Sequence, residues 1–272
     1  MSIQPSQPQS IGGVLDTTFQ LYKASLVKMI PLSLLMVIAG SPPSIYIFMR
    51  GAAGGNPGDP FAMLSMMQGG GYWLAALVGM IGSMWMLSAG YLKIGAIGSD
   101  GDLSVGTAVA RALPRLPLIL LMVILFGIAL TIGFILLIIP GLILTVSLGL
   151  CFSVAMFEGK GPVESLSESH RLVWGNWWRT AAILTVGFVI IIVIYLVAGL
   201  IIGLITPFLI FGGGGTENVL LISLISGLLI GVLMNLLMTP FYISLAVAIY
   251  WDLKLRKDGG DLAARVGALN PA

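Results

Sequence analysis

The chain has 272 residues, of which 58% are hydrophobic and 9% are charged, and its mean hydropathy is +1.05. Several uncharged stretches exceed the roughly 20 residues that a helix needs to cross a bilayer, so the composition excludes an ordinary soluble domain and indicates an integral membrane protein. The net charge of +2 gives no reason to expect a nucleic-acid partner.

The first third of the chain predicts two membrane spans. Residues 1–10 are polar and lack the apolar core of a signal peptide, so we expect a disordered N-terminal tail. The uncharged run 29–49 predicts the first span, bent by its prolines. The second begins at about Trp73, because residues 50–71 are rich in Gly and Pro and predict a loop.

The uncharged run 117–157 decides the number of spans. As one helix it would be about 60 Å long, roughly twice the thickness of the hydrocarbon core. Pro140 and Gly141 lie near its middle, and such a pair breaks a helix, so we expect two short helices joined by a tight turn. The runs 180–215 and 218–251, separated by a glycine-rich linker, bring the total to six spans.

The basic residues test this count independently of hydropathy. With six spans and a cytoplasmic N-terminus, only Arg50 of the 13 Lys and Arg residues lies outside, as the positive-inside rule requires. The sequence therefore predicts a multi-pass protein with both termini in the cytoplasm. Its three parts are the tail over residues 1–10, a six-span domain over 11–257 and a cytoplasmic tail over 258–272.

A short amphipathic segment that ends in a basic residue precedes three of the spans. Residues 15–28 align with residues 166–179, which pairs Phe19 with His170, and residues 104–117 form a weaker third copy. This pattern fits a two-span unit repeated three times, or a coincidence of amphipathic patterns, and we leave both open. The predicted fold class is all-α: a polytopic transmembrane helical bundle of six spans, with short cytoplasmic amphipathic helices preceding spans 1, 3 and 5.

The stretch 161–180, GPVESLSESHRLVWGNWWRT, holds three of the six tryptophans and the only histidine. We expect a helix from Pro162 whose apolar face lies at the membrane surface, followed by tryptophans at headgroup depth. His170 has no Cys, Asp or Glu at ligand spacing beside it, so we expect no metal and no cofactor. The face expected to be apolar comprises Val163, Leu166, His170 and Val173, and the tryptophans are Trp174, Trp177 and Trp178.

Other residues predict interface contacts and helix packing. We expect these basic residues, together with His170 and the three tryptophans, to contact lipids or partner proteins: Arg111, Arg115, Arg171, Arg179, Lys254, Arg256 and Lys257. The GxxxG spacings Gly199/Gly203 and Gly227/Gly231 predict close contact between spans 5 and 6, with a dimer seam as the alternative. We expect Asn235 to bond to a neighbouring helix.

Three segments resemble successive signatures of one family. They are SIGGVLDTTFQLYK, the run from IIPGLILTVSLGL to LVWGNWWR, and FYISLAVAIYWDLKLRKDGGDL, which together extend from Ser10 to about Leu262. They are similar to bacterial membrane proteins of the glycerophosphoryl diester phosphodiesterase membrane domain. The resemblance implies a multi-span module of the bacterial inner membrane without an assigned activity of its own, and the soluble phosphodiesterase barrel of other members is absent here.

The residues predict no catalytic activity. Phosphodiester hydrolysis needs several carboxylates and histidines around a cation, whereas the acidic residues here are scattered over loops. We therefore expect a scaffold or accessory module that contacts membrane lipids or other membrane proteins. The alternative is a small transporter or lipid-handling protein with a pathway between the repeats, since spans interrupted by proline often line a substrate site. The oligomeric state stays open.

Overall fold

The computed structural model describes residues 2–52, 62–212 and 219–269, and the regular structure in these ranges is entirely helical. The helices are Ile11–Gly40 (α1), Pro42–Ala52 (α2), Ala62–Met67 (α3), Gly70–Gly98 (α4), Val105–Ala112 (α5), Leu116–Leu136 (α6), Ile138–Leu148 (α7), Cys151–Glu158 (α8), Pro162–Val173 (α9), Trp177–Gly212 (α10) and Val219–Leu269 (α11).

Within the described ranges, six helical stretches are long and apolar enough to cross a membrane, which confirms the predicted all-α bundle of six spans. They are Ile11–Gly40, Gly70–Gly98, Val105–Leu136, Ile138–Glu158, Trp177–Ile205 and Gly227–Gly259. Parts of two predicted loops, residues 53–61 and 213–218, lie outside the described residues, as do residues 270–272.

The first span differs from the prediction. Ser10 caps α1, since its Oγ accepts a hydrogen bond from the Gly13 N–H at 3.1 Å, and the helix continues without a break to Gly40. The segment 15–28 therefore continues directly into the first span and is not a separate interfacial helix. Neither Gly nor Pro interrupts that segment, whereas Pro42 and Pro43 begin a new helix, α2.

The other two amphipathic segments behave differently from each other. A 3₁₀ turn, Leu113–Arg115, joins α5 directly to α6, so this segment too runs into its span. Only α9 is set apart from the following span, by Gly175, whose φ of 92° favours glycine. The predicted unit of one interfacial helix followed by two spans is therefore seen most clearly in the copy that contains residues 166–179.

The run 117–157 folds back on itself, as predicted. Leu137 is extended and ends α6, so the turn lies three residues before Pro140. Close packing of the two helices requires glycine, because a Cβ on Gly133 would lie 3.1 Å from the Gly141 Cα. A second break at Gly149 and Leu150, which the sequence reading missed, separates α7 from α8.

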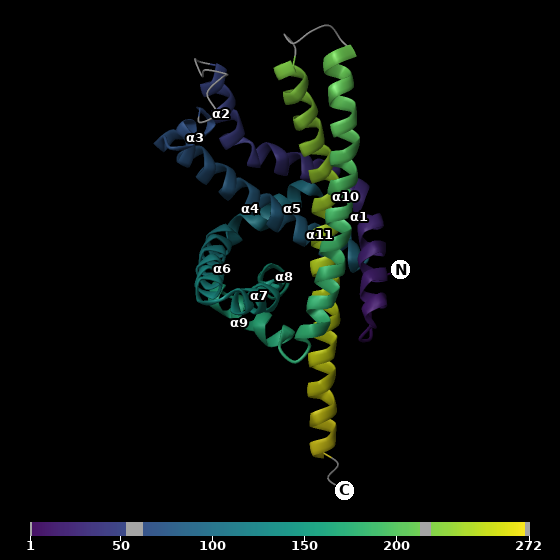
Figure 1. Cartoon of the computed structure of the whole chain (residues 1–272). Helices are drawn as coiled ribbons and strands as arrows, with labels where there is room; N and C mark the ends of the chain where they lie inside the picture. Colours follow the sequence, from purple (N-terminus) through teal and green to yellow (C-terminus); the bar gives the residue numbers. More distant parts are fainter. Residues whose placement is uncertain (1, 53–61, 213–218, 270–272) are drawn as a thin grey trace.

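The buried core joins α1, α4, α8 and the second half of α11, whose ribbons Figure 1 labels. α1 packs against both α4 and α11, and α10 lies alongside α11. Figure 1 views α6 and α7 nearly along their axes while α10 and α11 run lengthwise, so the spans are strongly inclined to one another. The most hydrophobic 18-residue stretch of α10 has no buried residue, so this span leaves most of its surface to lipid or to another protein.

The predicted packing of the GxxxG glycines is wrong within one chain. A Cβ placed on Gly199, Gly203, Gly227 or Gly231 would meet nothing within 4 Å. The glycine that brings α10 close to α11 is Gly187, where a Cβ would lie 2.2 Å from a Leu245 methyl group. Asn235 accepts a hydrogen bond from Thr239 of its own helix at 3.3 Å.

Candidate functional site

The polar residues of the described chain gather where the starts of α1, α6 and α10 meet the ends of α4, α8 and α11. We call this region the charged end. Three long-range contacts define it: Arg115 donates to the Met156 carbonyl, Arg179 pairs with Asp252, and Tyr250 donates to Glu158. Together with the hydrogen bonds that the segment before α1 makes to Asp252 and to the Gly98 carbonyl, these contacts bring three span starts and three span ends into one region, so the six spans alternate in direction.

Asp252 is the centre of the first cluster at the charged end. Its side chain is 1% exposed, and its Oδ2 lies 3.1 Å from Arg179 Nη2 and 3.0 Å from Arg256 Nε. The other carboxylate oxygen accepts the backbone N–H of Gln9 at 2.7 Å. Both arginines also donate to the Gln9 carbonyl. A buried carboxylate needs this number of partners, because desolvation without them is costly.

This cluster binds the segment that precedes α1 through hydrogen bonds to the backbone of Gln9. Further along the same segment, the backbone N–H groups of Ile3 and Gln4 each donate to the Gly98 carbonyl at 3.0 Å, which satisfies a carbonyl at the end of α4. The segment over residues 2–10, which was predicted to be disordered, is therefore ordered in the structure, and we call it the strap. Its polar backbone pairs with α4 and α11, and a disordered tail would make neither contact.

Glu158 and Glu168 form a second cluster beside the first. Glu158 accepts from Tyr250 at 2.9 Å and from Lys254 at 3.0 Å, and Lys160 lies 2.7 Å from its other oxygen. Lys160 also lies 3.1 Å from Glu168. The cluster ties α11 to the end of α8 and to α9.

Glu168 is 8% exposed and forms a bidentate pair with Arg171, with nitrogen–oxygen distances of 2.6 and 3.0 Å. The hydrogen bond from Arg171, followed by that from Lys160, lowers the pKa of Glu168 to about 2. The hydrogen bond to Glu158 raises the pKa of Lys160. Both groups therefore stay charged over the whole physiological pH range.

The helix α9 buries a face that shares only Val173 with the apolar face expected from the sequence. Its buried residues are Ser165, Glu168, Ser169, Leu172 and Val173, whereas Val163 is 65% exposed. Ser169 donates to the Ser147 carbonyl at 2.9 Å and accepts from the Leu150 N–H at 3.1 Å, at the break between α7 and α8. Two serines four residues apart let helices approach closely, and this spacing could have revealed the packing face.

Most of the predicted contact residues have partners within the chain. Lys254, Arg256, Arg171 and Arg179 pair with the three carboxylates above. Arg115 donates to carbonyls near the end of α8, and Lys257 donates to the Trp174 carbonyl at 3.1 Å. Lys93, which the sequence reading passed over, is 4% exposed and donates to the Leu103 carbonyl at 2.7 Å.

The aromatic residues after α9 divide into buried and exposed ones. Trp177 donates its indole N–H to the Ile143 carbonyl at 3.3 Å and packs against the core. Trp174 is 57% exposed and Trp178 83% exposed. The His170 ring lies 5.0 Å from the Trp174 ring, so the histidine packs against an indole. Arg111 is exposed on α5.

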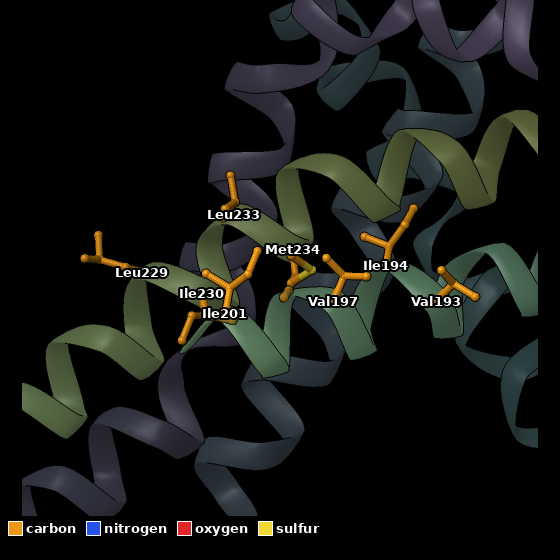
Figure 2. A pocket seen from close by; sticks show the side chains of 9 residues that line it. Val193, Ile194, Val197, Ile201, Leu229, Ile230, Leu233 and Met234 are labelled. Carbon is orange, nitrogen blue, oxygen red and sulfur yellow. The ribbon is translucent and has the colours of Figure 1, made fainter. Parts of the chain in front are cut away.

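An apolar groove of about 440 Å³ lies between α10 and α11, away from the charged end (Figure 2). Its lining is aliphatic except for Met234, with Ile194, Val197 and Ile201 from α10 and Ile230 from α11. A groove of this composition can hold hydrocarbon but offers no partner to a polar solute.

Comparison with known proteins gives one family and one curated relative. A family model described as "Domain of unknown function (DUF7847)" matches residues 71–253, which is more than half of the chain. The chain belongs to the DUF7847 family. This DUF7847 protein is also similar to the UPF0259 membrane protein SG1383 of Sodalis glossinidius (strain morsitans), with 26% identity over 100 residues.

That match covers 37% of this DUF7847 chain and 40% of the relative. No solved structure matches the chain. The relative's name identifies a membrane protein, and the six apolar helices of this chain indicate several membrane passes. Neither comparison carries the name of the phosphodiesterase membrane domain, so that resemblance stays a prediction.

Proposed function

We propose that this protein is a non-catalytic module of the bacterial inner membrane whose charged end faces the cytoplasm and contacts lipids or partner proteins. The proposal rests on one observation: charged residues and apolar residues are separated along the helix bundle. Ion pairs join α8, α9, α10 and α11 at one end of the bundle, while the groove between the last two spans is purely apolar. The positive-inside rule favours the cytoplasm for the charged end, since basic residues gather there. Membership of a wider group with the phosphodiesterase membrane domain is part of the same proposal.

The state of the carboxylates supports a non-catalytic role. A general base should have a pKa near the operating pH, whereas the pKa of Glu168 is about 2. Asp252 and Glu158 each contact two cationic side chains. Groups neutralised in this way hold helices together and have little capacity left for proton transfer.

Three apolar or aromatic side chains on and just after α9 point outward and define a contact surface, which we call the α9 surface: Val163, Trp174 and Trp178. Their exposure is 65%, 57% and 83%. Tryptophan and valine suit either the headgroup region of a bilayer or an apolar patch on another protein. The surface differs from the predicted set, because most of the arginines and lysines in that set are engaged internally.

The test replaces tryptophans on the α9 surface and compares them with a matched tryptophan elsewhere. Trp174→Ser with Trp178→Ser should leave insertion intact and reduce the lipids and proteins that co-purify in polymer-extracted membrane discs. Trp73→Ser is the control, because Trp73 is 64% exposed at the opposite end of α4. Equal losses in both variants, or none, would remove the support for a contact surface. Hydrolysis of a phosphodiester by the purified protein, lost on replacing His170, would refute the non-catalytic role.

The groove between α10 and α11 favours a second candidate function, a small transporter or lipid-handling protein. Its aliphatic lining suits an acyl chain. Replacing Val197 with Trp should fill the groove, and a lipid-handling protein should then lose transfer of fluorescent phospholipid between leaflets of reconstituted vesicles. Wild-type vesicles that transfer lipid no faster than protein-free vesicles would exclude this candidate.

A further inference from the structure

A second pocket, of about 470 Å³, lies at the charged end between α4, α8, α11 and the strap before α1. Its polar lining residues, which we call its rim, include Gln4, Ser99, Lys254 and Asp258. Its apolar lining residues, which we call its floor, include Leu92, Phe157 and Trp251. We call it the rim pocket. It differs from the groove of Figure 2, whose lining offers no polar group.

Packing fixes the walls of the rim pocket. A Cβ on Gly95 would lie 2.4 Å from the Phe157 ring, and one on Gly98 would lie 2.2 Å from the Trp251 ring, so these two glycines allow the aromatic rings to sit directly on α4. Gln4 is held by its backbone hydrogen bond to Gly98. The pocket is therefore formed before any ligand arrives, which lowers the cost of binding.

The rim pocket lies where the apolar part of the last span gives way to charged residues, and this position indicates an amphipathic ligand. The long uncharged run of the last span ends at Trp251, and charged residues follow at once from Asp252. Tyr and Trp at such a transition mark the headgroup region of a bilayer. A ligand that fills the rim pocket therefore places its polar part near Lys254 and its apolar part on Phe157 and Trp251.

The charges on the rim indicate a zwitterion. Lys254 and Asp258 are four residues apart on α11, and such residues are neighbours, with about 5–6 Å between their Cβ atoms. The Lys254 ammonium has three N–H donors, of which Glu158 accepts one at 3.0 Å. Asp258 is exposed at the rim. One cation and one anion at this spacing match the phosphate and the amine of an aminoethyl phosphodiester.

We propose that the rim pocket binds the headgroup of a phospholipid with a primary ammonium, with its phosphate on Lys254 and its ammonium on Asp258. This inference deepens the proposed function, since it names the lipid class that the charged end contacts. A primary ammonium donates hydrogen bonds to the Asp258 carboxylate, which a trimethylated amine cannot do. A trimethylated amine prefers open aromatic faces, whereas Trp251 is 7% exposed and Tyr250 5% exposed.

The test measures lipid retention by native mass spectrometry on the full chain in micelles that contain one lipid at a time: phosphatidylethanolamine, phosphatidylcholine or phosphatidylglycerol with the same acyl chains. We expect the ethanolamine lipid to be retained about tenfold more than either other lipid, the size of one charge-assisted hydrogen bond. Asp258→Asn should remove this preference, and Lys254→Gln should weaken retention of all three. Lys257→Gln is the matched control, because Lys257 donates to the Trp174 carbonyl and is absent from the pocket lining.

Equal retention of the choline lipid, tighter retention of the glycerol lipid, or an unchanged preference in Asp258→Asn would overturn the proposal. A separate arm adds soluble phosphoethanolamine, which should not displace the lipid at millimolar concentration, and displacement would overturn the lipid as the source of the headgroup. The two proposals fail separately. Loss of the ethanolamine preference refutes the rim pocket, whereas indifference to replacement of Trp174 and Trp178 refutes the α9 surface.

Discussion

Replacing Asp252 with Asn tests whether ion pairs hold the charged end together. The substitution keeps the shape of the side chain and removes the charge that Arg179 and Arg256 share. Removing one partner of a buried ion pair costs about 3–5 kcal/mol, and we expect the lower end, about 3 kcal/mol, because the Arg256 side chain is 30% exposed and can turn to water. At roughly 2–4 °C per kcal/mol for a domain of this size, the midpoint of unfolding should fall by about 6–12 °C.

Cys151 provides the assay. It is the only cysteine and is 2% exposed, so a thiol-reactive fluorescent dye reports when the core opens during heating in detergent. Asp16→Asn, an exposed carboxylate on α1, is the control and should change the midpoint little. The double variant Arg179→Gln with Asp252→Asn should cost less than the sum of the two single variants by about 1–2 kcal/mol, because the pair is already broken. Equal midpoints for Asp252→Asn and Asp16→Asn, or additive losses, would refute the reasoning.

Three further predictions follow from other features. Gly98→Ala should lower the midpoint of unfolding, because the added Cβ would lie 2.2 Å from the buried indole of Trp251. Gly199→Ala should not lower it, since nothing lies within 4 Å of a Cβ there. The reverse order of the two midpoints in the thiol assay would contradict the packing. The stabilisation from Glu168 should be complete above its unfolded pKa of 4.5 and should disappear as pH falls toward 2. The midpoints of unfolding of the wild type and Glu168→Gln, measured by circular dichroism, should therefore converge in acid. A constant difference between the two midpoints from pH 7 to about 2.5 would contradict the assigned pairs. Reporter fusions near Gly161 and at residue 270 should both be cytoplasmic, and a periplasmic signal from either would exclude six spans.

The number of spans could be predicted from the sequence because it depends on two coarse signals. The run 117–157 is too long for one crossing, and the basic residues take one side only if it folds back. The start of the first span could not be predicted in the same way. The amphipathic segment 15–28, which ends in a basic residue, suggested a separate helix at the surface, but Lys23 and Lys28 are exposed on a helix whose other face, from Val14 to Ser33, is buried.

The sequence indicated where the residues of the candidate site lie along the chain, but not which partner each of them has. The sequence reading grouped the basic residues near the ends of the spans as contact residues, but most of them have partners within the chain that lie far away in the sequence, such as Asp252 for Arg179. No local pattern encodes such a pair. The face of α9 was assigned from apolar residues, whereas the packing uses Ser165 and Ser169, because small side chains decide how closely helices approach.

Site-specific photo-crosslinking in living bacteria tests the central claim, that the charged end is a contact surface, most directly. A photoreactive amino acid is placed at Val163, at Trp178 and, for comparison, at Trp73 on the opposite end of α4. Our account predicts discrete, reproducible adducts with headgroups or with defined proteins from the first two positions and not from Trp73. The same diffuse lipid labelling at all three positions would contradict it and leave the charged end as a membrane anchor.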